Sequence, residues 1–199
     1  MKKLSLLLIS FIFISKVAYS TTYNSDPEIF IKELVSDSIN KLSDKNTSEE
    51  DKKKFIESIA VENVDINALG LYTLGELRKS ANKSSVNRYQ QVFKKYFLKS
   101  LTSRLSDYSS NKFEIISAEK KSVNYTIVKS KILENDKQPE IKIDWRIYTK
   151  NPDKPLIRDL IIEGLSLART QKEEFASILN SNEGDINALF TTLEEFTKN

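Results

Sequence analysis

The side chains able to do acid–base chemistry in this 199-residue sequence are carboxylates, lysines and tyrosines, because it contains no histidine and no cysteine. Without histidine, the commonest general base near neutral pH and the commonest zinc ligand are missing. Nucleophile arrangements that pair serine or cysteine with histidine are excluded as well. Any catalysis would depend on Asp, Glu, Lys or Tyr, and any metal would need oxygen ligands.

The acidic residues do not form an obvious catalytic pair. Glu173-Glu174 and Glu194-Glu195 fall on expected helices, where adjacent residues point to different faces. Asp144 and Asp159 are candidates for a buried carboxylate, but the alternation of their expected strands places both opposite the apolar residues, towards water. Gly164-Leu165-Ser166 lacks the G-x-S-x-G nucleophile elbow. The sequence therefore predicts no enzyme, no metal site and no cofactor.

The N-terminus has the pattern of a secretory signal peptide. Lys2 and Lys3 precede an uncharged apolar run from Leu4 to Ser15, and Ala18-Tyr19-Ser20 offers small residues for cleavage. The run is too short to span a bilayer, which takes about 20 apolar residues. We expect residues 1–20 to be the signal peptide and residues 21–199 to form one domain.

Removal of this peptide changes the charge balance. The sequence has 31 basic and 28 acidic residues, and the peptide takes away Lys2, Lys3 and Lys16 but no acid. The remaining chain then has no net side-chain charge. Proteins that bind nucleic acid need a basic surplus to displace counterions from phosphates, so we expect no nucleic-acid partner.

The elements that must position any site follow the order helices, strands, helices. Asp26-Pro27 predicts the start of a first helix and Ser48 the start of a second, and residues 65–77 form a short third helix. The longest helical pattern runs over 84–108, with a wide aromatic stripe. Its members are Tyr89, Val92, Phe93, Tyr96, Phe97, Leu101 and Leu105. Two more helices are expected near 170–182 and 185–197.

Between these helices the period of the apolar residues changes to two. We expect strands near 112–121, 123–134, 140–150 and 156–163, joined by short polar hairpins. The predicted fold class is therefore α+β, with an antiparallel sheet of about four strands that has one apolar face. The pattern alone leaves two interpretations open: the aromatic stripe and the sheet form an ordinary core, or they enclose a pocket for an apolar ligand.

Several segments resemble one known family. Residues 159–166 match a strand that ends in Asp, alternating apolar residues, Glu-Gly, an apolar residue and Ser. Phe175, Gly184-Asp185-Ile186, Leu74-Gly75 and Gln90-Gln91 with Phe93 follow the same family pattern. In these features the chain resembles the MlaC family, the toluene-tolerance auxiliary proteins of phospholipid ABC transport systems. An aromatic often found just after the Leu-Gly pair, and a tryptophan before the last strand, are absent here.

The resemblance implies a twisted antiparallel sheet partly wrapped by N- and C-terminal helices, with an apolar pocket between them. It also implies a periplasmic phospholipid carrier that maintains outer-membrane lipid asymmetry. The implied partners are a phospholipid, an outer-membrane lipoprotein complex and an inner-membrane MCE-domain ABC transporter. The pocket residues predicted on this basis are Phe93, Phe97, Leu101, Val123, Tyr125, Ile127, Ile143, Trp145, Ile147, Leu160 and Ile162.

Two other functions stay open at this point. A binding protein for another apolar ligand, such as a sterol or hydrocarbon, would have the same kind of pocket. A small α+β enzyme would need Asp144 or Asp159 to face an interior cavity.

Overall fold

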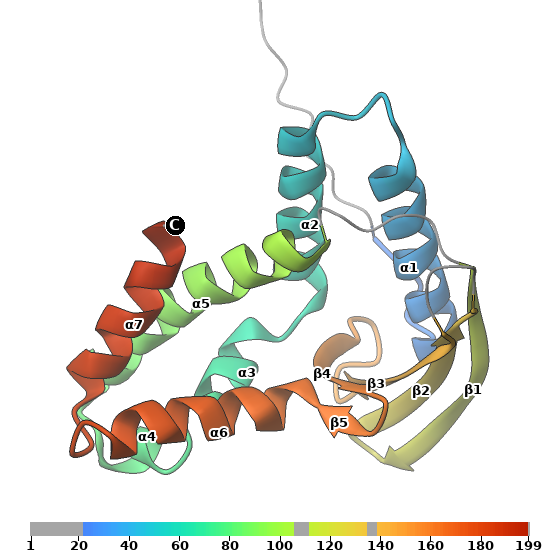
Figure 1. The fold of residues 1–199 in the computed structure, drawn as a ribbon. Helices are drawn as coiled ribbons and strands as arrows, with labels where there is room; N and C mark the ends of the chain where they lie inside the picture. The colour runs from blue at the N-terminus through green and yellow to red at the C-terminus, as the bar shows by residue number, and fades with distance from the viewer. Residues whose placement is uncertain (1–21, 106–111, 135–138, 199) are drawn as a thin grey trace, which may run out of the picture.

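The computed structural model describes residues 22–105, 112–134 and 139–198. Within these ranges seven helices and five strands follow one another as helices, strands and helices (Figure 1). The helices before the sheet are α1 (Pro27–Ser43), α2 (Glu49–Asn63), α3 (Ile66–Thr73), α4 (Leu77–Ser80) and α5 (Lys83–Leu105). The remaining elements are β1 (Phe113–Ser122), β2 (Tyr125–Ile132), β3 (Ile141–Tyr148), β4 (Leu156–Ile162), β5 (Leu165–Ser166), α6 (Leu167–Asn180) and α7 (Ile186–Lys198).

Helices α1 and α2 begin at the N-cap residues that the sequence predicts. The Asp26 carboxylate accepts hydrogen bonds from the N–H groups of Glu28 and Ile29 at 3.0 and 3.1 Å, and Pro27 occupies the first helical position. Ser48 accepts from the Asp51 N–H at 3.1 Å at the start of α2. The predicted starts of α1 and α2 are therefore confirmed.

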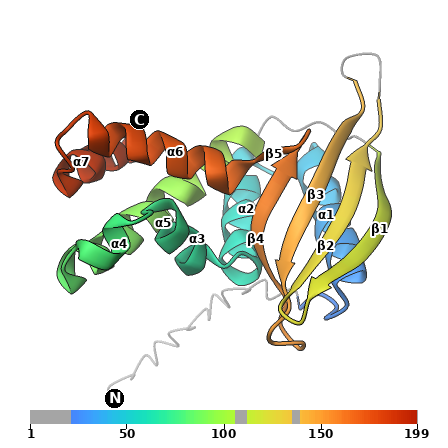
Figure 2. The same cartoon turned by 90° about the horizontal axis from the view of Figure 1, so that it is seen from below.

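The sheet is an antiparallel meander in the order β1-β2-β3-β4-β5 (Figure 2). The α+β class of the fold and the first four strands of the sheet agree with the sequence prediction. The fifth strand was not predicted. It contains two residues and follows at once after a turn in which Glu163 and Gly164 have positive φ angles of 48° and 82°. A strand this short leaves no alternation that could be read from sequence.

Among the described residues two apolar clusters hold the fold together, and the partly buried Val64 packs against both. The sheet core joins α1 to one face of the sheet, and its buried members are Phe30, Ile31, Leu34, Val128, Ile132, Ile143, Trp145, Ile147 and Ile157. The helical cluster joins α3, α5, α6 and α7, and its buried members are Ile66, Leu74, Tyr89, Val92, Phe93, Phe175, Leu179, Leu189, Phe190 and Leu193. In Figure 2, β4 is the long strand nearest to the helical cluster and β1 is the farthest.

The two clusters meet at β4. The backbone N–H of Asp65, just before α3, donates to the Ile157 carbonyl at 2.9 Å, and Val64 forms a parallel bridge with Ile157. Helix α6, which begins immediately after β5, also contacts β4. Among the described helices none is long and apolar enough to cross a bilayer. The predicted signal peptide at residues 1–20 and the end of the 84–108 helix lie outside the described residues.

Candidate functional site

A cleft of about 760 Å³ lies on the face of the sheet opposite α1. Strands β2, β3 and β4 and the end of β1 form its floor, and α3 and the start of α6 form its walls. We call it the main cleft. Its apolar side chains are Ala68, Leu69, Tyr72, Tyr125, Ile127, Ile161 and Ala168, and its polar ones are Lys121, Ser122, Lys129, Asp144, Arg146, Arg158 and Asp159. A volume of this size falls within the usual range for small-molecule sites.

The strand register places charged side chains in the main cleft. Val128 pairs with Trp145 and Trp145 with Leu160, so these residues share the face that packs on α1. The neighbouring pairs, Ile127 with Arg146 and Arg146 with Asp159, share the other face. The strand residues that line the cleft are therefore those that alternate with the core residues, and they include charged side chains as well as Ile127 and Ile161.

Asp159 fastens the start of α6 to the sheet. Its carboxylate accepts a hydrogen bond from the Ser166 hydroxyl at 2.6 Å and another from the Ala168 N–H at 3.0 Å. Ser166 in turn caps α6 by accepting from the Arg169 N–H at 3.1 Å. Residue Asp159 is only 5% exposed. The prediction that Asp159 faces water was wrong, because α6 folds back over its face of the strand.

Arg158 ties the other wall of the main cleft to the sheet. Its guanidinium donates to the Asp65 carboxylate at 2.7 and 2.9 Å and to the Tyr125 hydroxyl at 2.7 Å. The same group stacks 3.4 Å above the ring of Tyr148. Burial lowers the pKa of Arg158, but the hydrogen bonds with Tyr125 and Asp65 outweigh it, so that this pKa is raised. Asp65 also caps α3 through the Ala68 N–H at 3.1 Å.

A second, smaller cleft of about 430 Å³ continues along α6. It is lined by Arg146, Ile161, Gly164, Leu165, Ser166, Arg169, Thr170 and Glu173. We call it the second cleft. Arg146 and Ile161 line both clefts, so the two are neighbours along β3 and β4.

The structure separates the predicted pocket residues into three groups. Tyr125 and Ile127 line the main cleft. In the helical cluster, Phe93 is buried and Phe97 packs against its ring with centroids 6.1 Å apart, while Leu101 on the same helix is partly buried. The sheet core contains Ile143, Trp145, Ile147, Leu160 and Ile162. Val123 stands apart from all three groups, because it occupies the β1–β2 turn and is 78% exposed.

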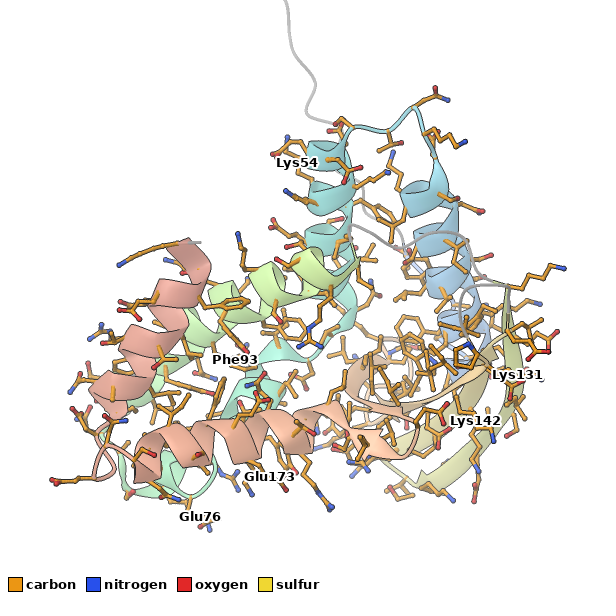
Figure 3. The ribbon with its side chains drawn as sticks, in the orientation of Figure 1. Lys54, Glu76, Phe93, Lys131, Lys142 and Glu173 are labelled. Atoms are coloured by element: carbon orange, nitrogen blue, oxygen red, sulfur yellow. The ribbon has the colours of Figure 1, made fainter. Side chains whose placement is uncertain are left out.

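Figure 3 shows Phe93 among the helices, whereas Lys131 and Lys142 mark the sheet in another part of the molecule. The rings of Tyr89, Phe93 and Phe175 pack on one another, with Phe93 and Phe175 edge-to-face at 6.3 Å. On the sheet side, the Trp145 indole N–H donates to Ser130 at 2.8 Å. Whether any of the eleven contacts a lipid stays a prediction.

Sequence reasoning missed most of the cleft lining. Arg146 could have been found, because in the alternation of β3 it takes the face opposite Trp145, as does Asp144. Arg158 lies at an irregularity in the β3–β4 pairing, where Ile147 pairs with Ile157 and Arg146 with Asp159. A bulge of this kind has no signature in the sequence. Leu69, Tyr72 and Ala168 come from helices, and their place in the cleft depends on packing.

The chain was compared with protein families, curated proteins and solved structures. The sequence profile of the family described as MlaC protein matches residues 32–195. No curated protein matches significantly. Among solved structures, a phospholipid-binding protein from Ralstonia solanacearum, determined in complex with a phospholipid, superposes with a TM-score of 0.69. The two share 18% sequence identity over 84% of this chain and 94% of that chain, which establishes a common fold.

Proposed function

Because the chain belongs to the MlaC protein family, we propose that it binds a phospholipid in the main cleft and carries it through the periplasm. The carrier role would connect an outer-membrane lipoprotein complex with an inner-membrane MCE-domain ABC transporter. The phospholipid in the Ralstonia solanacearum protein, which has the same fold, supports the choice of ligand.

The observation that carries the proposal is the amphipathic lining of the main cleft. Leu69, Ile127 and Ile161 offer apolar surface, and Lys129 and Arg146 bring positive charge to the same cavity. The acyl chains of a phospholipid match the apolar surface, and its phosphate matches the positive charge. A sterol or hydrocarbon carries no anionic group for these basic side chains to bind, so a lipid with a phosphate matches the lining better.

The energetics suit a carrier. Each buried CH₂ group contributes about 0.8 kcal/mol relative to water, and the bilayer offers the same contribution. Transfer between membrane and protein is close to neutral where the cleft buries the acyl chains as fully as the bilayer does, and such a balance allows loading as well as release. The hydrogen bonds that Asp159 accepts from Ser166 and Ala168 give this carboxylate a structural role at the start of α6.

The proposal is tested by weighing the protein with its ligand. The chain is expressed with its N-terminal segment, purified from the periplasm without detergent and measured by native mass spectrometry. We expect a mass increase of one phospholipid, confirmed by extraction. A protein that is free of lipid, and that takes none up from liposomes, would contradict the proposal.

A matched pair of variants locates the ligand. Ala68→Phe adds a ring inside the main cleft, whereas Ala176→Phe adds the same ring on the exposed surface of α6. We expect the first variant to lose bound lipid and the second to retain it, with equal circular dichroism spectra. Equal lipid content in both variants would place the ligand elsewhere.

A further inference from the structure

The two arginines on the floor of the main cleft, Arg146 and Arg158, differ in how many contacts their guanidinium groups already make within the protein. Every face of the Arg158 guanidinium is occupied, by Asp65, by the Tyr125 hydroxyl and by the Tyr148 ring. Arg146 has one ionic contact among the described residues, 3.6 Å from its Nη1 to the Asp159 carboxylate. That distance is too long for a hydrogen bond, so the donors of Arg146 are available to a ligand.

Asp159 does not depend on Arg146. Its carboxylate accepts hydrogen bonds from Ser166 and Ala168 and lies at the start of α6, where the helix dipole favours a negative charge. Its side chain is 2% exposed, whereas that of Arg146 is 47% exposed. Arg146 can therefore turn towards a ligand without leaving a buried carboxylate unsatisfied.

Arg146 also lies where the two clefts meet, since both are lined by it and by Ile161. On one side lies the apolar surface of Leu69 and Ile127. On the other lies the second cleft, with Arg169, Thr170 and Glu173. In a phospholipid the phosphate likewise stands between the acyl chains and the polar headgroup.

We propose that Arg146 binds the phosphate group of the ligand, with the acyl chains in the main cleft and the headgroup in the second cleft. The guanidinium fork matches two phosphate oxygens at once. Arg169 and Glu173 bring opposite charges to the second cleft, so its lining does not select headgroups by net charge. This assignment rests on the proposed function and adds to it the residue that recognises the phosphate.

The experiment compares lipids with and without a phosphate. Wild-type protein, Arg146→Gln and Arg88→Gln are incubated with vesicles that contain phosphatidylethanolamine, phosphatidylglycerol and diacylglycerol, and the bound lipid is identified by mass spectrometry. Arg88→Gln removes the same charge from a residue that lines neither cleft, pairs with Glu194 and stacks on the Phe190 ring. Thermal unfolding checks that all three proteins are folded.

We expect Arg146→Gln to lower the loading of both phospholipids about tenfold, the effect of losing a charge-assisted hydrogen bond. Its loading of diacylglycerol should equal that of the wild type, and Arg88→Gln should behave as wild type with all three lipids. Arg146→Lys should recover part of the loss, since it restores the charge without the fork.

The possible failures are distinguishable. If the wild type loads phospholipid but Arg146→Gln loads it equally well, the role of Arg146 is overturned and the proposed function stands. If the wild type loads no lipid at all, both are overturned. Millimolar inorganic phosphate is added as a separate probe. A rise in melting temperature in the wild type but not in Arg146→Gln, without any lipid loading, would identify free phosphate as the ligand instead.

Discussion

At the scale of single residues, the helical cluster contains a buried polar contact. The Tyr89 hydroxyl lies 2.9 Å from the Thr73 hydroxyl, and the tyrosine is 0% exposed. Thr73 also donates to helix carbonyls of α3, at 3.0 and 3.1 Å. Burial raises the pKa of Tyr89 well above its ordinary value. The neutral phenol is therefore the form that the folded state stabilises.

This raised pKa predicts the behaviour of Tyr89→Phe at high pH. In the unfolded chain the phenol ionises near pH 10, so the stability contributed by neutral Tyr89 is complete below about pH 10 and decreases as the pH rises further. We expect Tyr89→Phe to cost about 1 kcal/mol at neutral pH through the lost hydrogen bond. Urea unfolding at about pH 7 and pH 11 should then show the smaller alkaline loss in the variant. A parallel decline in both proteins would contradict the assignment.

At the scale of elements, α3 and α5 approach each other closely. A Cβ atom placed on Gly70 of α3 would lie 2.8 Å from the ring of Phe93 on α5. Phe93 is 2% exposed and is held by the rings of Tyr89, Phe97 and Phe175. The ring has little freedom to withdraw, so the glycine sets the spacing between these helices.

Gly70→Ala tests this spacing. Alanine would gain about 1 kcal/mol in helix propensity, but overpacking in a core costs about 1–3 kcal/mol. We expect a net loss of about 1 kcal/mol in the free energy of unfolding. The same substitution is then made in a Phe93→Leu background, where the opposing side chain is smaller. Gly70→Ala should lower the free energy of unfolding less in that background than in the wild type. If the cost of Gly70→Ala is the same in both backgrounds, Phe93 is not the obstacle.

At the scale of the whole molecule, the Arg158–Asp65 ion pair joins the sheet to the helical cluster. It connects β4 with the cap of α3, beside the backbone hydrogen bond from Asp65 to Ile157. Both side chains are partly buried, at 25% and 18% exposure. Removal of either partner therefore weakens one of the contacts through which the sheet core and the helical cluster meet at β4.

A double-mutant cycle measures this connection. Arg158→Met, Asp65→Asn and the double variant are compared by denaturant unfolding; asparagine keeps the ability to cap α3. We expect a coupling energy of about 1 kcal/mol, near the lower end of the range for residues in contact because the pair is partly solvated. The corresponding cycle for the exposed Lys54–Glu50 pair on α2 should give about 0.5 kcal/mol or less. Equal coupling in both cycles would mean that the pair does not join the two parts.

Much of the fold could be predicted because its signals are local. Asp26, Ser48 and Asp65 cap helices through backbone groups two or three residues away, and the alternation Ile143, Trp145, Ile147 follows from the pleat of one strand. The family pattern of residues 159–166 is local as well. These features were sufficient for the α+β class, the order of elements and the family.

The site itself depended on tertiary structure. Register between strands placed Ile127 opposite Arg146 and Val128 opposite Trp145, which put Ile127 and Trp145, predicted to share one wall, on different faces of the sheet. A bulge oriented Arg158, and the return of α6 buried Asp159. The sequence by itself determined which residues are apolar and where the longer helices and the first four strands lie. Only the packing of distant elements decided which apolar residues fill a core and which line a cleft, because burial depends on neighbours that no local pattern specifies.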